Sequence, residues 1–143
     1  MQVTSTSVTI RRLGRSDLGK LAALSAALGA ESADDWAERF GHRDVVILGA
    51  ESAGALVGYA AGEVRRSFGR RAAAGWIDAF GIDLSRRGQG VGRDLATAIL
   101  DELRTRGADR VFTLVPLHDR TLDPFFRDLG FRDEPFVCLG KAL

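Results

Sequence analysis

The sequence contains one cysteine, two lysines, one tyrosine and no asparagine among its 143 residues. The single cysteine, Cys138, excludes an intrachain disulfide framework, and because it lies in an apolar run we expect a buried, unreactive thiol. No apolar run reaches the length of a membrane span, and the first residues lack a signal-peptide pattern, so we expect a cytoplasmic protein without membrane contacts. The formal net charge of +1 gives no general attraction to nucleic acid.

The chain length predicts one domain, residues 1–143, with a polar and disordered stretch at Met1–Ser7. Alternating and helical spacings of apolar residues define the expected elements. The expected strands are Val8–Arg12, Val45–Ala50, Ala55–Val64, Ala74–Leu84, Arg110–Val115 and Phe136–Lys141. The expected helices are Leu18–Leu28, Ser32–Phe40, Gly90–Arg106 and Thr121–Leu129. This order predicts an α/β (α+β) fold in which a mixed sheet is flanked by helices.

A dense glycine turn, 85-SRRGQGVGRD-94, lies between an expected strand and an expected helix. Such a junction offers unpaired backbone N–H groups and the positive end of a helix dipole. Gly88, Gly90 and Gly92 let the backbone approach a ligand closely, and Arg87 and Arg93 add positive charge suited to phosphate oxygens. The turn therefore predicts a phosphate-binding site.

Two common nucleotide motifs do not fit this turn. A Walker A loop needs Lys-Ser or Lys-Thr after its last glycine, whereas Arg93-Asp94 follows Gly92. The dinucleotide fingerprint needs a glycine at position 93 and a parallel βαβ unit near the start of the chain, whereas a hairpin precedes this turn. Both readings are therefore excluded.

The run from Arg87 to Gly92 matches the pattern R-x-x-G-x-G. Together with the strand and turn 77-IDAFGIDLSRRGQGVG-92 and the segment 125-FFRDLGF-131, it resembles the GNAT superfamily of acetyl-CoA-dependent N-acetyltransferases. The resemblance extends from about Val8 to the C-terminus and is most specific over Ile77–Leu114. It implies a mixed, mostly antiparallel, twisted sheet of six to seven strands with the fourth and fifth strands splayed apart.

The resemblance also implies where acetyl-CoA, as co-substrate, binds. The pantetheine arm pairs with backbone of the fourth strand, and a β-bulge at Gly81 supplies an N–H to the thioester carbonyl. The pyrophosphate lies on the turn. The implied cofactor-binding residues are Phe80, Ile82, Asp83, Leu84, Arg87, Gly88, Gln89, Gly90, Val91, Gly92 and Arg93. No metal is implied.

The implied reaction is direct attack of a primary amine on the thioester, which needs a proton acceptor and a proton donor. Asp78, inside an otherwise apolar strand, is a candidate base, although it is equally a structural Asp that pairs with an arginine. His118, after the fifth strand, is a second candidate because histidine titrates near neutrality. Phe126 stands where many members have the tyrosine that protonates the thiolate, and Asp119 replaces a common asparagine. Tyr59 replaces that acid only if the fold brings it to the cleft.

Three functions remain open at this stage. The first is an N-acetyltransferase with an amine substrate that the resemblance leaves undefined. The second, favoured by Phe126, is a non-catalytic acyl-CoA-binding or sensing module. The third is an arginine-rich interaction protein without a CoA site.

The basic segment Arg65–Arg71 has two interpretations. It is either a solvated hairpin tip or a contact for an acidic partner or the CoA 3′-phosphate. Because only one strand follows Phe131, we expect an uncovered edge strand and a homodimer.

Overall fold

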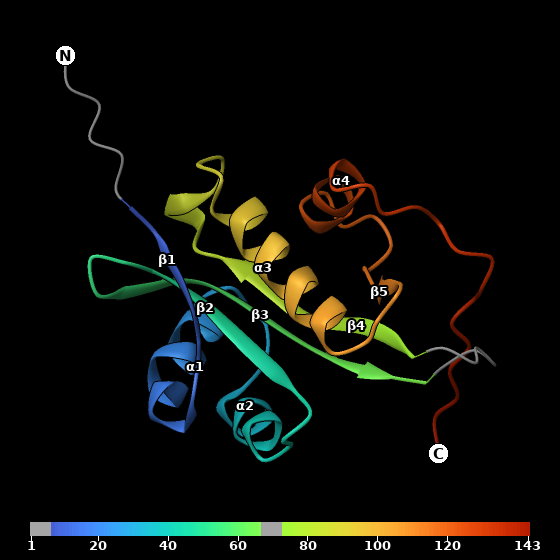
Figure 1. Ribbon diagram of the computed structural model, residues 1–143, viewed down its shortest axis with the longest axis horizontal. Helices are drawn as coiled ribbons and strands as arrows, with labels where there is room; N and C mark the ends of the chain where they lie inside the picture. Colours follow the sequence, from blue (N-terminus) through green and yellow to red (C-terminus); the bar gives the residue numbers. More distant parts are fainter. Residues whose placement is uncertain (1–6, 67–72) are drawn as a thin grey trace.

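A computed structural model describes residues 7–66 and 73–143, which form one five-stranded sheet with helices on both faces (Figure 1). The sheet order follows the chain: β1-β2-β3-β4-β5. The strands are β1 (Thr9–Arg12), β2 (Val46–Ser52), β3 (Ala55–Arg65), β4 (Ala74–Ile82) and β5 (Val111–Thr113). The pairs β1–β2, β2–β3 and β3–β4 are antiparallel, and β5 runs parallel to β4.

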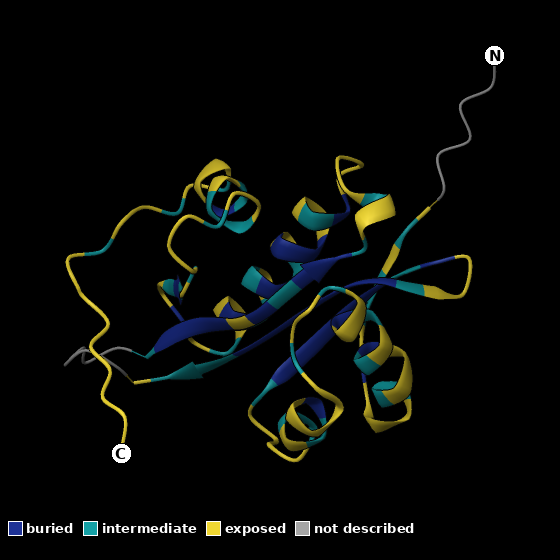
Figure 2. Ribbon diagram, turned by 180° about the vertical axis from the view of Figure 1, so that it is seen from behind, coloured by how far each residue is buried: buried dark blue, intermediate teal, exposed yellow. Residues whose placement is uncertain are grey.

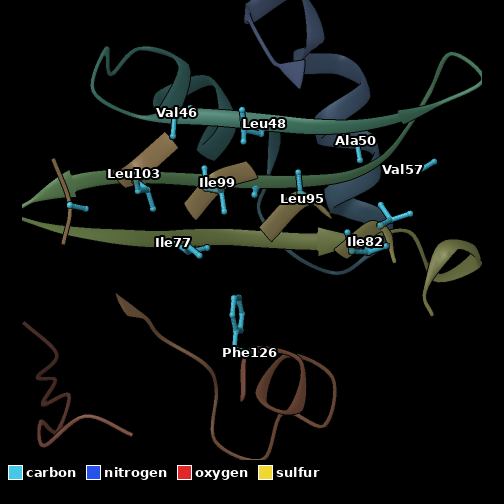
Figure 3. Close-up of a cluster of buried hydrophobic side chains, with 13 residues drawn as sticks. Val46, Leu48, Ala50, Val57, Ile77, Ile82, Leu95, Ile99, Leu103 and Phe126 are labelled. Carbon is cyan, nitrogen blue, oxygen red and sulfur yellow. The ribbon is translucent and has the colours of Figure 1, made fainter. Parts of the chain in front are cut away.

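The helices divide the apolar residues into two main cores, one on each face of the sheet. On one face, η1 (Arg15–Asp17), α1 (Leu18–Ala27) and α2 (Ala33–Phe40) cover Ile47, Tyr59 and Ala79. On the other face, α3 (Val91–Thr105) and α4 (Leu122–Asp128) cover Leu48, Ile77 and Ile82. Figure 3 shows the second core, with Phe126 pointing from α4 toward β4.

The long helix α3 forms because its apolar residues repeat along one face. Leu95, Ile99 and Leu103 are fully buried against the sheet, one turn apart. Gly90 precedes the helix with φ at 85°, and Gly107 follows it with φ at 104°. Both ends therefore use the left-handed backbone that glycine adopts without strain.

Most of the predicted elements are present, with ends that differ by a few residues, but the predicted strand Phe136–Lys141 is wrong. Residues 132–143, here called the C-terminal tail, contain no strand and are mostly exposed (Figure 2). The sheet consequently has five strands rather than six to seven. Cys138, predicted to be buried, is exposed for the same reason.

Two sequence predictions fall largely outside the described residues: the disordered stretch Met1–Ser7, except for Ser7, and the basic segment Arg65–Arg71, except for Arg65 and Arg66. Within the described residues, none of the helices combines the length and the apolar character needed to cross a membrane.

The bulge of β4 lies at Asp78 and not at Gly81, where the sequence predicted it. Ala61 pairs with Ala79 and Gly62 pairs with Ile77, so Asp78 is the extra residue. Gly81 pairs regularly with Tyr59. Gly62 permits the bulge because a Cβ at this position would lie 2.5 Å from the backbone oxygen of Trp76.

Beyond the bulge, β4 and β5 part. Their ladder contains only the pairs from Gly75↔Val111 to Ile77↔Thr113, and the Thr113 hydroxyl donates to the Ile77 carbonyl at 2.9 Å where it ends. β4 continues to Ile82, but β5 does not accompany it. The predicted splay of the fourth and fifth strands is therefore present.

Candidate functional site

The glycine turn connects β4 to α3 through a short 3-10 helix, η2 (Leu84–Arg86). Asp83 begins this helix, because its carboxylate accepts from the backbone N–H and the hydroxyl of Ser85, both at 3.0 Å. Gly88 and Gly90 then take φ values of 78° and 85°. No atom lies within 4 Å of where a Cβ would stand at either glycine, so their backbone faces open space.

The backbone N–H groups of residues 88–93 lie in this turn and in the first turn of α3. In the described part of the chain they donate to no protein acceptor, and the first helical bond runs from the Asp94 N–H to the Gly90 carbonyl at 3.1 Å. Unpaired donors at the start of a 15-residue helix can bind an anion together with the helix dipole. Arg93 is exposed beside them.

The open edge of β4 presents the backbone of Phe80 and Ile82. The Asp83 N–H donates to the Val57 carbonyl at 2.8 Å. The backbone N–H and carbonyl groups of Asp83, Gly81 and Ala79 therefore face β3, because alternate residues of a strand face the same neighbour. Phe80 and Ile82 lie between them and face the other way, where β5 is no longer present. The Gly81 N–H faces β3, which overturns the sequence-based expectation that it would bind the thioester carbonyl.

Helix α4 forms the wall opposite this edge. The Phe80 ring lies 5.0 Å from the Phe125 ring and 5.6 Å from the Phe126 ring, centroid to centroid. Phe125 also packs on the turn, since a Cβ on Gly92 would lie 3.0 Å from its ring. The sequence analysis did not single out Phe125, although its place in the FFRDLGF segment was the available signal.

Arg87 in the turn and Asp119 before α4 lie near enough for their charges to interact. The N–H groups of Leu122 and Thr121 donate to the Asp119 carboxylate and hold its pKa below the ordinary value, and the charge of Arg87 acts in the same direction. The Arg87 Nε also donates to the Ile82 carbonyl at 3.4 Å. Asp119 thus fixes the start of α4 and balances part of the charge of Arg87.

No hydroxyl reaches the open edge of β4 from position 126 or from Tyr59. Phe126 is buried and has none. Tyr59 is 1% exposed, and its phenol lies against Gly81 on the face covered by α1. Burial raises the pKa of Tyr59 above its ordinary value. The fold therefore brings Tyr59 to β4 but seals it inside the core.

Asp78 is paired with an arginine, as one of the two interpretations in the sequence analysis expected. Its carboxylate is exposed at the bulge and accepts from Arg65 at 2.9 and 3.1 Å. Arg65 in turn lies over the Trp76 ring and contacts Glu63. The expected burial of Asp78 is wrong, because the bulge turns its side chain out of the apolar face.

His118 is exposed in the loop after β5 and has a φ of 65°. It lines an open cavity of about 1570 Å³ between the loop, α4 and the C-terminal tail. None of residues 80–93 lines this cavity. The cavity is therefore separate from the glycine turn and the β4 edge. Among the described residues, no group of three or more His, Cys, Asp or Glu side chains is placed to hold a metal ion.

The chain matches the family model described as "Acetyltransferase (GNAT) family" over residues 19–131. None of the curated proteins compared with the chain matches it. Solved structures share the fold at low identity.

An aminoglycoside N-acetyltransferase AAC(6')-Iy in complex with CoA has a TM-score of 0.86 and 16% identity, with 99% of each chain covered. An aminoglycoside acetyltransferase, meta-AAC0020, from an uncultured soil metagenomic sample has a TM-score of 0.79 and 20% identity over 95% of this chain and 96% of that one. A ribosomal-protein-alanine N-acetyltransferase from Brucella melitensis biovar Abortus 2308 has a TM-score of 0.81 and 20% identity over 96% of this chain and 100% of that one.

Proposed function

Since the chain belongs to the acetyltransferase (GNAT) family, it is an N-acetyltransferase with acetyl-CoA as co-substrate, and we propose that residues 80–93 hold the acetyl-CoA while a primary amine attacks it. The observation that carries this assignment is the set of unpaired N–H groups of residues 88–93 at the start of α3. Arg87 and Arg93 supplement them with charge.

Acetyl-CoA supplies a thioester, whose carbonyl carbon the amine attacks. The backbone of Phe80 and Ile82 pairs with the pantetheine amides, because these two residues face the open edge of β4. The Phe80 N–H replaces that of Gly81 as the donor to the thioester carbonyl oxygen. Asp83 and Leu84 hold the backbone where the strand passes into the turn.

Asp78 or His118 accepts the proton that the ammonium must lose before the amine attacks. Asp78 lies where β4 leaves β5, but its carboxylate is engaged by Arg65, which must move or act with it. His118 is exposed in the loop after β5. The rates of Asp78→Asn and His118→Gln separate the two, because each variant removes one of the two candidate proton acceptors and leaves the other in place.

The acceptor is a primary amine, and the named relatives suggest where to look. Two of the similar structures are aminoglycoside acetyltransferases and one is a ribosomal-protein-alanine N-acetyltransferase. An aminoglycoside panel and a set of peptides with free N-termini are therefore the first amines to test.

We also assign the protein to the cytoplasm and to a homodimer, the latter because β5 leaves an uncovered sheet edge.

The assignment is tested by calorimetric titration with acetyl-CoA. Gly90→Glu places bulk and negative charge among the phosphate-binding N–H groups and should abolish binding. Gly107→Glu is the matched control, because Gly107 lies at the other end of α3, also has a positive φ and also has no atom within 4 Å of a Cβ. Absence of binding by the folded wild type, or equal loss in both variants, would contradict the assignment.

A second function, a non-catalytic acyl-CoA-binding module, is favoured by one observation. Phe126 is buried and cannot donate a proton to the leaving thiolate. Thiol release in the presence of the amine panel distinguishes the two functions. CoA binding without thiol release on any amine would support the binding module.

A further inference from the structure

The gap between β4 and β5 is closed at one end by a side chain. The last pair of the ladder is Ile77↔Thr113, and the Thr113 hydroxyl donates to the Ile77 carbonyl at 2.9 Å. Ile77 is buried, whereas Thr113 is only partly buried. Because Thr113 ties the two strands at the point where they part, it forms the closed end of the gap.

Aromatic side chains close the gap on the face of the sheet that carries α3 and α4. Phe126 is 3% exposed, and its ring lies 5.6 Å from the Phe80 ring, centroid to centroid. Figure 3 shows Phe126 directed at β4 between the positions of Ile77 and Ile82. A group that lies in the gap therefore meets aromatic carbon on this face and has no room to bend into the core.

The direction of a bound acyl chain follows from the proposed acetyl-CoA site, on which the present inference rests. In that site the N–H groups of residues 88–93 hold the pyrophosphate, and the backbone of Ile82 pairs with the pantetheine. The Phe80 N–H then donates to the thioester carbonyl. An acyl chain beyond this carbonyl continues along β4 in the same direction, away from the turn and toward the pair Ile77↔Thr113.

The distance from the thioester to the closed end is short. Only Asp78 and Ala79 separate Ile77 from Phe80, and an extended chain advances roughly 3.3 Å per residue. Asp78 is the extra residue of the bulge, so it adds little to this length. The gap therefore accommodates the single methyl of an acetyl group, whereas an acyl chain with two more methylenes reaches Thr113.

We propose that Thr113 determines the acyl specificity of the protein, admitting acetyl-CoA and excluding longer straight-chain acyl-CoAs. Its side chain, held in place by the Ile77 carbonyl, stands where the acyl chain ends, and Phe126 blocks the way into the core. The exclusion is steric, because an added methylene has to displace groups that are already packed.

The first test is calorimetric titration of the wild type with acetyl-, propionyl- and butyryl-CoA, which differ only at the end of the acyl chain. Affinity should fall with each methylene, and butyryl-CoA should bind about tenfold or more weakly than acetyl-CoA. Equal affinities would mean that the chain leaves the gap on the exposed side at Asp78, which would overturn the proposal and leave the acetyl-CoA site standing. Absence of binding by all three would contradict that site as well.

The second test changes the closed end itself. Thr113→Ala removes the side chain beyond its Cβ and should bring the affinity for butyryl-CoA close to that for acetyl-CoA, whereas Thr113→Ser keeps the hydroxyl and should keep most of the discrimination. Thr97→Ala is the matched control, because the exposed Thr97 hydroxyl also donates to a backbone carbonyl at 2.9 Å, that of Arg93.

Circular dichroism establishes that each variant folds, and the wild-type titrations decide the limit on chain length without any variant. Unchanged discrimination in Thr113→Ala, or the same relaxation in Thr97→Ala, would overturn the role of Thr113.

Discussion

Phe126 is the residue at which the chain departs most clearly from the family pattern. Its ring is buried at the centre of contacts with Phe80, Phe125 and Phe131. We predict that Phe126→Tyr lowers the free energy of unfolding by about 1–3 kcal/mol, because the added hydroxyl would be buried among aromatic rings. Urea denaturation measures this change.

The same variant tests whether a hydroxyl at position 126 reaches the reacting atoms. If it stays in the aromatic cluster, the rate of thiol release should not increase. Phe125→Tyr is the control, since Phe125 neighbours Phe126 on α4 and is only partly buried. A faster reaction of Phe126→Tyr at unchanged stability would show that the hydroxyl enters the cleft.

For single residues, chemistry that depends on neighbours in the sequence could be predicted, whereas contacts with residues of another strand could not. The turn from Arg87 to Gly92 could be identified because its glycines and arginines are contiguous. The environment of Asp78 could not, because its exposure depends on the bulge opposite Gly62, and its partner Arg65 comes from the neighbouring strand.

The bulge in β4 is the element that opens the candidate site. It changes which backbone groups face outward, from Ile77 before the bulge to Phe80 and Ile82 after it. We predict that Gly62→Ala lowers the free energy of unfolding by about 2 kcal/mol or more, because the new Cβ would lie 2.5 Å from the Trp76 carbonyl oxygen, which is part of the backbone.

Two measurements test this role of Gly62. Urea denaturation gives the loss of stability, and titration with acetyl-CoA should show weaker binding, because a shifted register misplaces Phe80 and Ile82. Gly14→Ala is the control, since no atom lies within 4 Å of a Cβ at Gly14. If Gly62→Ala behaved like the control, β4 would not depend on the glycine for its bulge.

Element types were predictable where the pattern is local, as in α3, whose apolar residues recur every four positions and whose ends carry glycine. The strand predicted for Phe136–Lys141 was wrong for a different reason. A strand requires a partner, and no periodicity within residues 136–141 specifies whether that partner belongs to the same chain. The exposure of Cys138 follows from this error, since burial of the thiol depended on the strand being paired.

At the scale of the whole molecule, acetyl-CoA binding and dimerisation should each stabilise the fold independently of the other. The proposed acetyl-CoA site combines the β4 edge, the turn and α4, which lie together only in the folded chain. Ligand binding to the native state alone raises the free energy of unfolding by about 2.7 kcal/mol at a concentration one hundred times Kd. For a chain of this size, that should raise Tm by roughly 5–10 °C. The rise should be absent in Gly90→Glu.

Dimerisation should add a dependence of Tm on protein concentration, because dissociation accompanies unfolding. We predict this dependence for the wild type if it is the proposed homodimer, and acetyl-CoA should raise Tm at every protein concentration. Thermal unfolding over a hundredfold range of protein concentration, with and without acetyl-CoA, measures the two effects separately. If the rise in Tm caused by acetyl-CoA itself changed with protein concentration, dimerisation would alter the cofactor site, and the two equilibria would then be coupled.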